Sequence, residues 1–203
     1  MIDNLEIVIV GNKRKEIITA EFLKDIPYRI FYTTDYDLPK DFRINSKYLI
    51  YVSAFKNMLG AYRCFRGHQD ALKSCTKENI LVFEDDAVPN RGDWLEVVSK
   101  SIKMLEQFEI VSLHGRKVDF SLFNCIDKDD LKYFYKKNIN RDVKVYGSLC
   151  YLINKKTIDK VIQDEYEGYP MDMYISNRFS YCLLNPSPFN HDRKMGSLVE
   201  EKK

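Results

Sequence analysis

The sequence predicts an α/β domain built around a mostly parallel central sheet. Short apolar runs alternate along the chain with segments of helical periodicity, which is the pattern typical of βαβ units. The length of 203 residues suits one domain, residues 1–203, with a full hydrophobic core. Hydrophobic residues make up 45% of the chain, and 8 Gly and 6 Pro are too few for a disordered or fibrous protein.

Each element is predicted from local periodicity. Apolar runs that end at polar or turn residues predict strands at residues 5–10, 28–33, 48–52, 80–83, 109–113, 143–153 and 181–184. Helical spacing of apolar residues predicts helices at 15–24, 58–75, 94–105, 155–163 and 170–179. Asp93 and Asn154 are the expected N-caps of the helices that follow them. Residues 116–140 show no clear period, so we expect a loop with short elements there, and an irregular tail from residue 185.

Charge and cysteine content narrow the class of protein. The net charge of +2, from 32 basic and 30 acidic residues, does not indicate nucleic acid or a membrane surface as a partner. The 5 cysteines are odd in number and no two have C-x-x-C spacing, so neither a zinc site nor a disulfide framework is predicted. The N-terminus does not resemble a signal peptide, and no run approaches the roughly 20 apolar residues of a membrane span. We therefore expect a cytoplasmic protein with no membrane span.

Three consecutive carboxylates, Glu84-Asp85-Asp86, follow directly on the apolar run at 80–83. Ligands of open α/β sheets bind beyond the carboxyl ends of strands, so these acids stand where a ligand would bind. A divalent cation such as Mg²⁺ or Mn²⁺ would relieve their mutual repulsion and could bridge a diphosphate. Side chains alternate along an extended chain, so Glu84 and Asp86 are expected on one side and Asp85 on the other. The alternative is a solvated acidic junction with no ligand.

Four stretches in order resemble glycosyltransferase family 25, which contains lipooligosaccharide and collagen-type galactosyltransferases. The family pattern is a Gly, an apolar or aromatic run, Ser-His, a helix, and an apolar strand ending in Glu-Asp-Asp; a small-residue strand and a Pro-Val-Asp segment follow. The resembling stretches here are 60–68 (GAYRCFRGH), 80–86 (ILVFEDD), 147–153 (GSLCYLI) and 169–174 (YPMDMY). There are two departures: Gly67 stands where the family has Ser, and residues 10–15 (VGNKRK) replace a Leu-Asp-Arg-Arg type sequence.

The resemblance implies a GT-A type, Rossmann-like fold. Residues 1–115 would form mainly the donor-nucleotide half, and residues 116–203 mainly the acceptor half and C-terminal tail. It also implies an enzyme that transfers a sugar from a UDP-sugar donor to an acceptor hydroxyl. The implied reaction inverts the configuration at the anomeric carbon and uses Mn²⁺ or Mg²⁺ as cofactor. Such transfer needs stabilisation of the departing diphosphate, which a metal held by Asp86 would supply.

The candidate site residues fall into three groups. Asp86 and His191 are the expected metal ligands. Asp172, which lies between two methionines, is the expected general base toward the acceptor hydroxyl, and Asp85 is expected on the acceptor side. The residues expected to bind the donor are Arg66, His68, Glu84, Tyr32, Thr33 and Asp35. Two of these residues keep a structural alternative to their role in the site. In that alternative His68 is a histidine bonded to a backbone carbonyl, and Asp172 is an ordinary acid at a helix N-terminus.

The sequence leaves alternatives open for the identity of the acceptor and for the class of reaction. The acceptor would be a saccharide, a hydroxylated side chain or a hydroxylated nucleic-acid base. Basic and aromatic residues interleave over 132–144, which is a pattern that can bind a polynucleotide, although a solvated loop with core-packed aromatics is the plainer interpretation. The competing functions are a metal-dependent nucleotidyl or phosphoryl transferase that uses the same acids, and a catalytically inactive binding module of the same fold.

Overall fold

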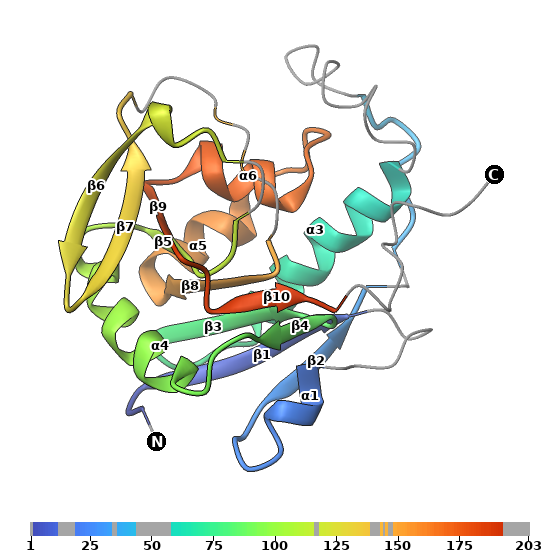
Figure 1. Cartoon of the computed structure of the whole chain (residues 1–203). Coiled ribbons are helices and arrows are strands. Elements are labelled where there is room, and N and C mark those ends of the chain that lie inside the picture. The colour runs from blue at the N-terminus through green and yellow to red at the C-terminus, as the bar shows by residue number, and fades with distance from the viewer. Residues whose placement is uncertain are drawn as a thin grey trace.

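A computed structural model describes residues 2–11, 19–33, 36–43, 58–115, 118–138, 143, 145 and 148–192. Its main sheet has eight strands in the order β2-β1-β3-β8-β5-β9-β7-β6 (Figure 1). These strands are β1 Leu5–Gly11, β2 Arg29–Tyr32, β3 Asn79–Glu84, β5 Ile110–Ser112, β6 Phe123–Lys128, β7 Leu131–Lys136, β8 Cys150–Asn154 and β9 Tyr181–Leu184. A separate two-stranded ribbon pairs β4 Ala87–Pro89 with β10 Phe189–His191.

The described α-helices are α1 Thr19–Phe22, α3 Met58–Lys73, α4 Trp94–Ile102, α5 Lys155–Gln163 and α6 Met171–Arg178. Short 3-10 turns cover Lys103–Glu106 and Phe120–Leu122. In the part of the chain that the structure describes, no helix combines the length and the apolar character that crossing a bilayer requires.

The prediction of a mostly parallel sheet is wrong. Only the pairs β1–β2, β1–β3 and β5–β9 are parallel, while the other four pairings of the sheet are antiparallel. Strand β8 is antiparallel to both of its neighbours, β3 and β5, and the hairpin β6–β7 extends the sheet beyond β9. An apolar run predicts that a strand is buried, but it carries no information about direction, so the sheet is mixed.

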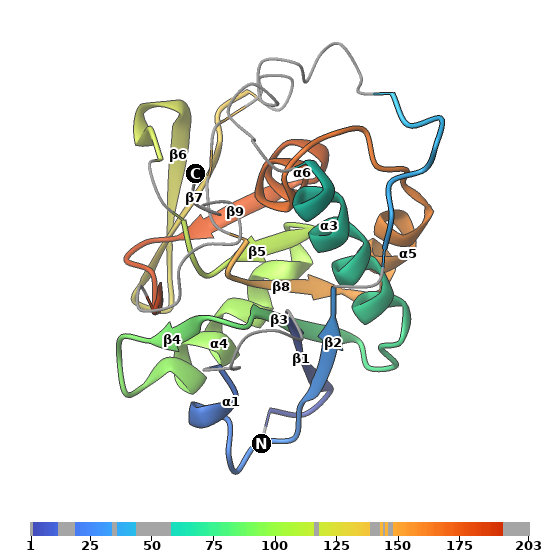
Figure 2. The same cartoon turned by 90° about the vertical axis from the view of Figure 1, so that its right-hand side faces the viewer.

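Side-chain alternation gives the sheet two apolar faces. Along β1, Val8 and Val10 belong to one core cluster, and Ile7 and Ile9 belong to the other. The first cluster packs against α3, α5 and α6, and the second packs against α4 and α1 (Figure 2). The sheet is therefore covered on both faces, and its strand ends remain as the place for a site.

Most predicted elements are confirmed, with shifted ends. The helix at 155–163 and the strand at 181–184 match α5 and β9, and Asn154 caps α5 by accepting a hydrogen bond from the Thr157 N–H at 2.9 Å. The strand predicted for 143–153 begins only at residue 150. Asp93 holds the N-cap position of α4 but makes no capping hydrogen bond, and both of its carboxylate oxygens accept from Arg91 instead. The strand predicted for 48–52 lies outside the described residues.

The prediction of a loop with short elements for residues 116–140 is right only in part, because the short elements include a paired hairpin, β6–β7. Its turn residues Asp129 and Asp130 have φ of 52° and 63°, the left-handed region that tight hairpin turns require. Aspartate tolerates this conformation, but an Asp-Asp pair is a much weaker hairpin signal than Asn-Gly. The aromatic residues of β7 pack inward: Tyr133 is buried and bonded to Ser101, and Phe134 packs on Phe120.

The tail, which was predicted to be irregular from residue 185, contains a strand that was not predicted, β10.

Candidate active site

The candidate site lies at the carboxyl ends of the parallel strands β1 and β3. Strand β1 ends at Gly11 and β3 ends at Glu84, next to Asp85 and Asp86. The Asp85 side chain lies directly over Gly11, because a Cβ on Gly11 would stand 2.9 Å from the Asp85 Cβ. The absence of a side chain at Gly11 is therefore what allows the acidic turn to approach the end of β1.

A residue that sequence reasoning missed fixes the backbone of this turn. Thr19, fully buried at the start of α1, donates its hydroxyl to the carbonyls of Glu84 at 2.6 Å and Ala87 at 3.0 Å. Its own N–H donates to the Asp85 carbonyl at 3.2 Å. The acidic turn is thus held by contacts with residues 65 and 68 positions away, for which a single threonine in the sequence gives no signal.

The ribbon β4–β10 brings His191 to Asp86. His191 Nδ1 lies 3.1 Å from Asp86 Oδ2, although the residues are 105 positions apart, and the Asp192 N–H donates to the Asp86 carbonyl at 2.9 Å. Asp86 Oδ1 and His191 Nε2 are both buried and have no hydrogen-bond partner among the described residues. The ring of His114, at the end of β5, packs edge-on against His191 with centroids 5.0 Å apart. The two predicted metal ligands therefore lie together, each with one polar atom unsatisfied.

Glu84 is directed toward α3. Ser148 donates a hydrogen bond to its Oε1, and His68 Nε2 lies 4.0 Å from the same oxygen. Burial, and next the charge of Asp86, raise the pKa of Glu84 to about 8 against the effect of the Ser148 hydrogen bond. Glu84 therefore carries a proton in this environment at neutral pH.

His68 is fully buried beneath the acidic turn. Its Nδ1 lies 2.8 Å from the Tyr151 hydroxyl, so the bond to a backbone carbonyl considered from the sequence is replaced by a bond to a side chain. Burial lowers the pKa of His68 to about 3, which leaves the ring neutral. Because the His68 side chain has no exposed surface, we expect it to affect donor binding through Glu84 and not by direct contact with the donor.

Asp172 lies in the first turn of α6 and is half-buried. Its Oδ1 accepts a hydrogen bond from the Met173 N–H at 2.8 Å, as expected for an acid at a helix N-terminus. Burial is the largest cause that raises the pKa of both Glu84 and Cys64, and the negative charge of Asp172 is a smaller contribution in each case. The carboxylate is therefore within electrostatic reach of the acidic turn, even though the two segments lie far apart in the sequence.

The other described candidates for donor binding lie at the end of β2 and on α3. Tyr32 is 40% exposed at the end of β2, beside Gly11 in the parallel register. Thr33 is buried against Gly67 of α3. Arg66 donates to Gln69 Oε1 at 2.9 Å and stacks on Tyr36, on a different face of α3 from His68. Asp35 lies outside the described residues.

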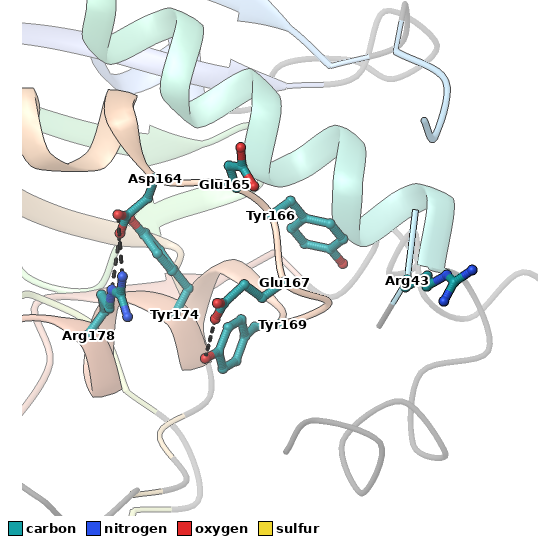
Figure 3. A pocket seen from close by; sticks show the side chains of 8 residues that line it. All are labelled: Arg43, Asp164, Glu165, Tyr166, Glu167, Tyr169, Tyr174 and Arg178. Atoms are coloured by element: carbon teal, nitrogen blue, oxygen red, sulfur yellow. Dashed lines mark hydrogen bonds and ion pairs between the residues drawn. The ribbon is translucent and has the colours of Figure 1, made fainter. Parts of the chain in front are cut away.

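A cavity of about 380 Å³ opens elsewhere, beside α6 and the segment before it (Figure 3). Its lining is Arg43, Asp164, Glu165, Tyr166, Glu167, Tyr169, Tyr174 and Arg178, which includes none of the predicted site residues. Several of its polar groups bind one another, with Arg178 and Tyr174 both donating to Asp164 and Tyr169 donating to Glu167, while the buried Tyr166 hydroxyl has no hydrogen-bond partner among the described residues. The cavity is therefore distinct from the acidic turn, where the predicted metal ligands Asp86 and His191 meet.

The fold and site define an α/β enzyme with a carboxylate and histidine cluster at one edge of its sheet. The family model of glycosyltransferase family 25 (LPS biosynthesis protein) matches residues 4–175. The chain belongs to glycosyltransferase family 25, and the protein is accordingly a glycosyltransferase. A search of curated proteins finds no match.

Two solved structures are similar at low identity. A197 from STIV is 14% identical, with a TM-score of 0.48 over 91% of this chain and 83% of that chain. HddC from Yersinia pseudotuberculosis is 10% identical, with a TM-score of 0.37 over 89% of this chain and 68% of that chain. Both scores are too low to carry an argument, so the GT-A type of fold stays a prediction.

Proposed function

We propose that the protein transfers a hexose from a UDP-sugar to an acceptor hydroxyl, with inversion and with Mn²⁺ or Mg²⁺ bound at Asp86 and His191. The observation that carries the proposal is the meeting of these two side chains at the carboxyl edge of the sheet. A glycosyltransferase must stabilise the charge that develops on the departing diphosphate, and this edge gathers the charged residues suited to that task.

The residues present fit a divalent ion. Asp86 Oδ1 and His191 Nε2 are buried polar atoms that lack partners among the described residues, and such atoms are costly unless something binds them. His191 Nδ1 faces Asp86 Oδ2, so the imidazole would have to turn for both residues to bind one ion. A carboxylate with an imidazole is a donor set that suits Mn²⁺. A bound ion would neutralise negative charge on the diphosphate as it leaves.

The remaining roles follow from position. Asp172 would accept the proton of the acceptor hydroxyl, whose oxygen attacks the anomeric carbon while the bond from that carbon to the diphosphate oxygen breaks on the opposite face. This geometry inverts the anomeric centre. Tyr32, an exposed aromatic at the edge of the sheet, would stack on the donor base. Glu84 and His68 would act as positioning residues beneath the acidic turn.

The acceptor that we propose is a saccharide. The polynucleotide alternative rested on interleaved basic and aromatic residues, and the described aromatics of β7 are engaged in packing. A two-metal phosphoryl transferase would need a second group of acids near the first. Asp119, one candidate for that group, uses its carboxylate to accept hydrogen bonds from the N–H and hydroxyl of Ser121.

Isothermal titration calorimetry with UDP tests the metal site directly. We expect the wild-type protein to bind UDP tightly with Mn²⁺ and weakly with chelator. In Asp86→Asn the UDP affinity should be the same in both conditions. Asp85→Asn is the matched control, because it removes the same charge one residue away, from a side chain that lies over Gly11. Equal UDP affinity with and without metal would overturn the metal assignment. Donor hydrolysis by the wild type, measured over a panel of nucleotide sugars, would identify the donor.

A further inference from the structure

Beneath the acidic turn, α3 and β3 bring together three groups that can bind a metal. Cys64 and His68 lie one helical turn apart on α3, so their side chains share a face. Glu84, at the end of β3, faces them from the sheet. One ligand atom from each residue lies within 4.8 Å of the other two. The sequence did not predict this cluster, because C-x-x-x-H on a helix is half of a site and its third member is distant in the chain.

The His68 ring is oriented as a ligand. Its Nε2 is buried, lacks a hydrogen-bond partner among the described residues, and lies 4.0 Å from Glu84 Oε1. That separation is too long for a hydrogen bond. Two ligands of one tetrahedral Zn²⁺ stand roughly 3.3–3.8 Å apart, and a nitrogen–oxygen pair is at the short end of that range, so closure by about 0.7 Å would seat an ion between them. Tyr151 accepts the Nδ1–H in the tautomer that leaves a lone pair on Nε2, the outer-sphere arrangement usual for a metal-binding histidine.

The electrostatic surroundings favour a cation. Burial is the largest cause that raises the pKa of the Cys64 thiol, and the negative charges of Asp172 and Asp85 raise it further. The same negative field would be relieved by a divalent ion. Cys64 and Glu84 keep some exposure, which provides a path for an ion to enter from the edge of the sheet. A thiolate ligand selects Zn²⁺ over the harder Mg²⁺ and Mn²⁺.

We propose that Cys64, His68 and Glu84 form a Zn²⁺ site that is separate from the Asp86–His191 pair. Binding deprotonates the Cys64 thiol and the Glu84 carboxyl, both protons go to solvent, and His68 coordinates as the neutral ring. The ion ties α3 to the end of β3 and so fixes the start of the acidic turn. This site does not depend on the nature of the sugar donor, so it can be tested with metal alone.

When Co²⁺ takes the place of Zn²⁺, a thiolate ligand produces a charge-transfer absorption band that oxygen and nitrogen ligands do not produce. The full-length protein, stripped with chelator, is titrated with Co²⁺ in the absence of nucleotide. We expect a near-ultraviolet charge-transfer band that saturates at one equivalent and disappears on addition of Zn²⁺. Cys64→Ser should lose the band, while Cys75→Ser, which alters another buried thiol after the same helix, should keep it. Tyr151→Phe should weaken Co²⁺ binding by roughly 10–100-fold, as loss of an outer-sphere partner does.

A second measurement on the wild type avoids the risk that Cys64→Ser fails to fold. Zn²⁺ should protect Cys64 from alkylation, read by peptide mass spectrometry, while the exposed Cys125 reacts equally with and without metal. If Asp86→Asn retains the Co²⁺ charge-transfer band, the site at Cys64, His68 and Glu84 is distinct from the proposed catalytic metal site at Asp86 and His191. Co²⁺ binding without a charge-transfer band, or alkylation of Cys64 unaffected by Zn²⁺, would overturn the proposal and leave the proposed transferase untouched.

Discussion

Replacing Gly67 by Ala should destabilise the protein, and the neighbouring Thr33 should decide by how much. A Cβ on Gly67 would stand 2.4 Å from the Thr33 Cγ2 and 3.2 Å from the Val10 Cγ1. Real Cβ atoms essentially never approach other heavy atoms as closely as the first of these distances. Thr33 cannot move away freely, because it is buried and its N–H donates to the Gly11 carbonyl at 2.9 Å. This contact also explains why the chain departs from the family pattern, which carries Ser at this position.

The magnitude follows from two opposing effects. Overpacking of this kind costs about 1–3 kcal/mol. Gly67 lies inside the 16-residue helix α3, where Ala is favoured over Gly by about 1 kcal/mol. We therefore expect Gly67→Ala to lower the free energy of unfolding by about 0–2 kcal/mol. Thr33→Ser removes the Cγ2 methyl, so in that background the same substitution should be neutral or should stabilise by up to about 1 kcal/mol.

Denaturant unfolding of the four proteins in this double-mutant cycle is the assay. The expected result is a coupling energy of about 1–3 kcal/mol between Gly67→Ala and Thr33→Ser. Gly92→Ala is the control, because a Cβ there would meet no atom of the described residues within 4 Å. An effect of Gly67→Ala that is the same in both backgrounds would refute the reasoning, since it would mean that the Thr33 methyl does not limit how closely α3 approaches the sheet.

Three further predictions concern the reaction, the acidic turn and the dependence on pH. Asp172→Asn should lower kcat by roughly 10²–10⁴-fold and leave UDP affinity unchanged, as loss of a general base does; steady-state kinetics with calorimetry would show a contradiction if UDP binding fell in parallel. Thr19→Val should cost about 1–3 kcal/mol in chemical denaturation, because two carbonyls of the acidic turn lose a buried donor; an unchanged midpoint would contradict the anchoring role. Burial raises the pKa of Glu6, but two backbone N–H groups and Arg29 outweigh it and hold the pKa below the usual value. The stabilisation by Glu6 is therefore present above the ordinary pKa of a glutamate and is lost as the pH falls through the lowered one. Glu6→Gln should flatten the acid limb of a stability curve, and an identical limb in both proteins would count against this.

Local periodicity in the sequence was enough to locate many elements and the acidic motif. The apolar runs at 5–10 and 181–184 are β1 and β9, the helical pattern at 155–163 is α5, and Glu84-Asp85-Asp86 ends β3 as expected. These features depend on burial and helical spacing within a few residues, which a single sequence displays directly. The ordered motifs also sufficed to predict family membership, which the family match over residues 4–175 confirms.

Only the tertiary structure decided which of these elements meet, and in which direction. The antiparallel course of β8 between β3 and β5 depends on how the chain returns to the sheet, which an apolar run does not encode. The contact of His191 with Asp86 depends on the pairing of β10 with β4, and β10 is too short to be predicted from periodicity. The cluster of Cys64, His68 and Glu84 forms because α3 packs over the end of β3. Each of these contacts joins residues that are distant in the sequence, and their closeness is a property of packing and not of local pattern.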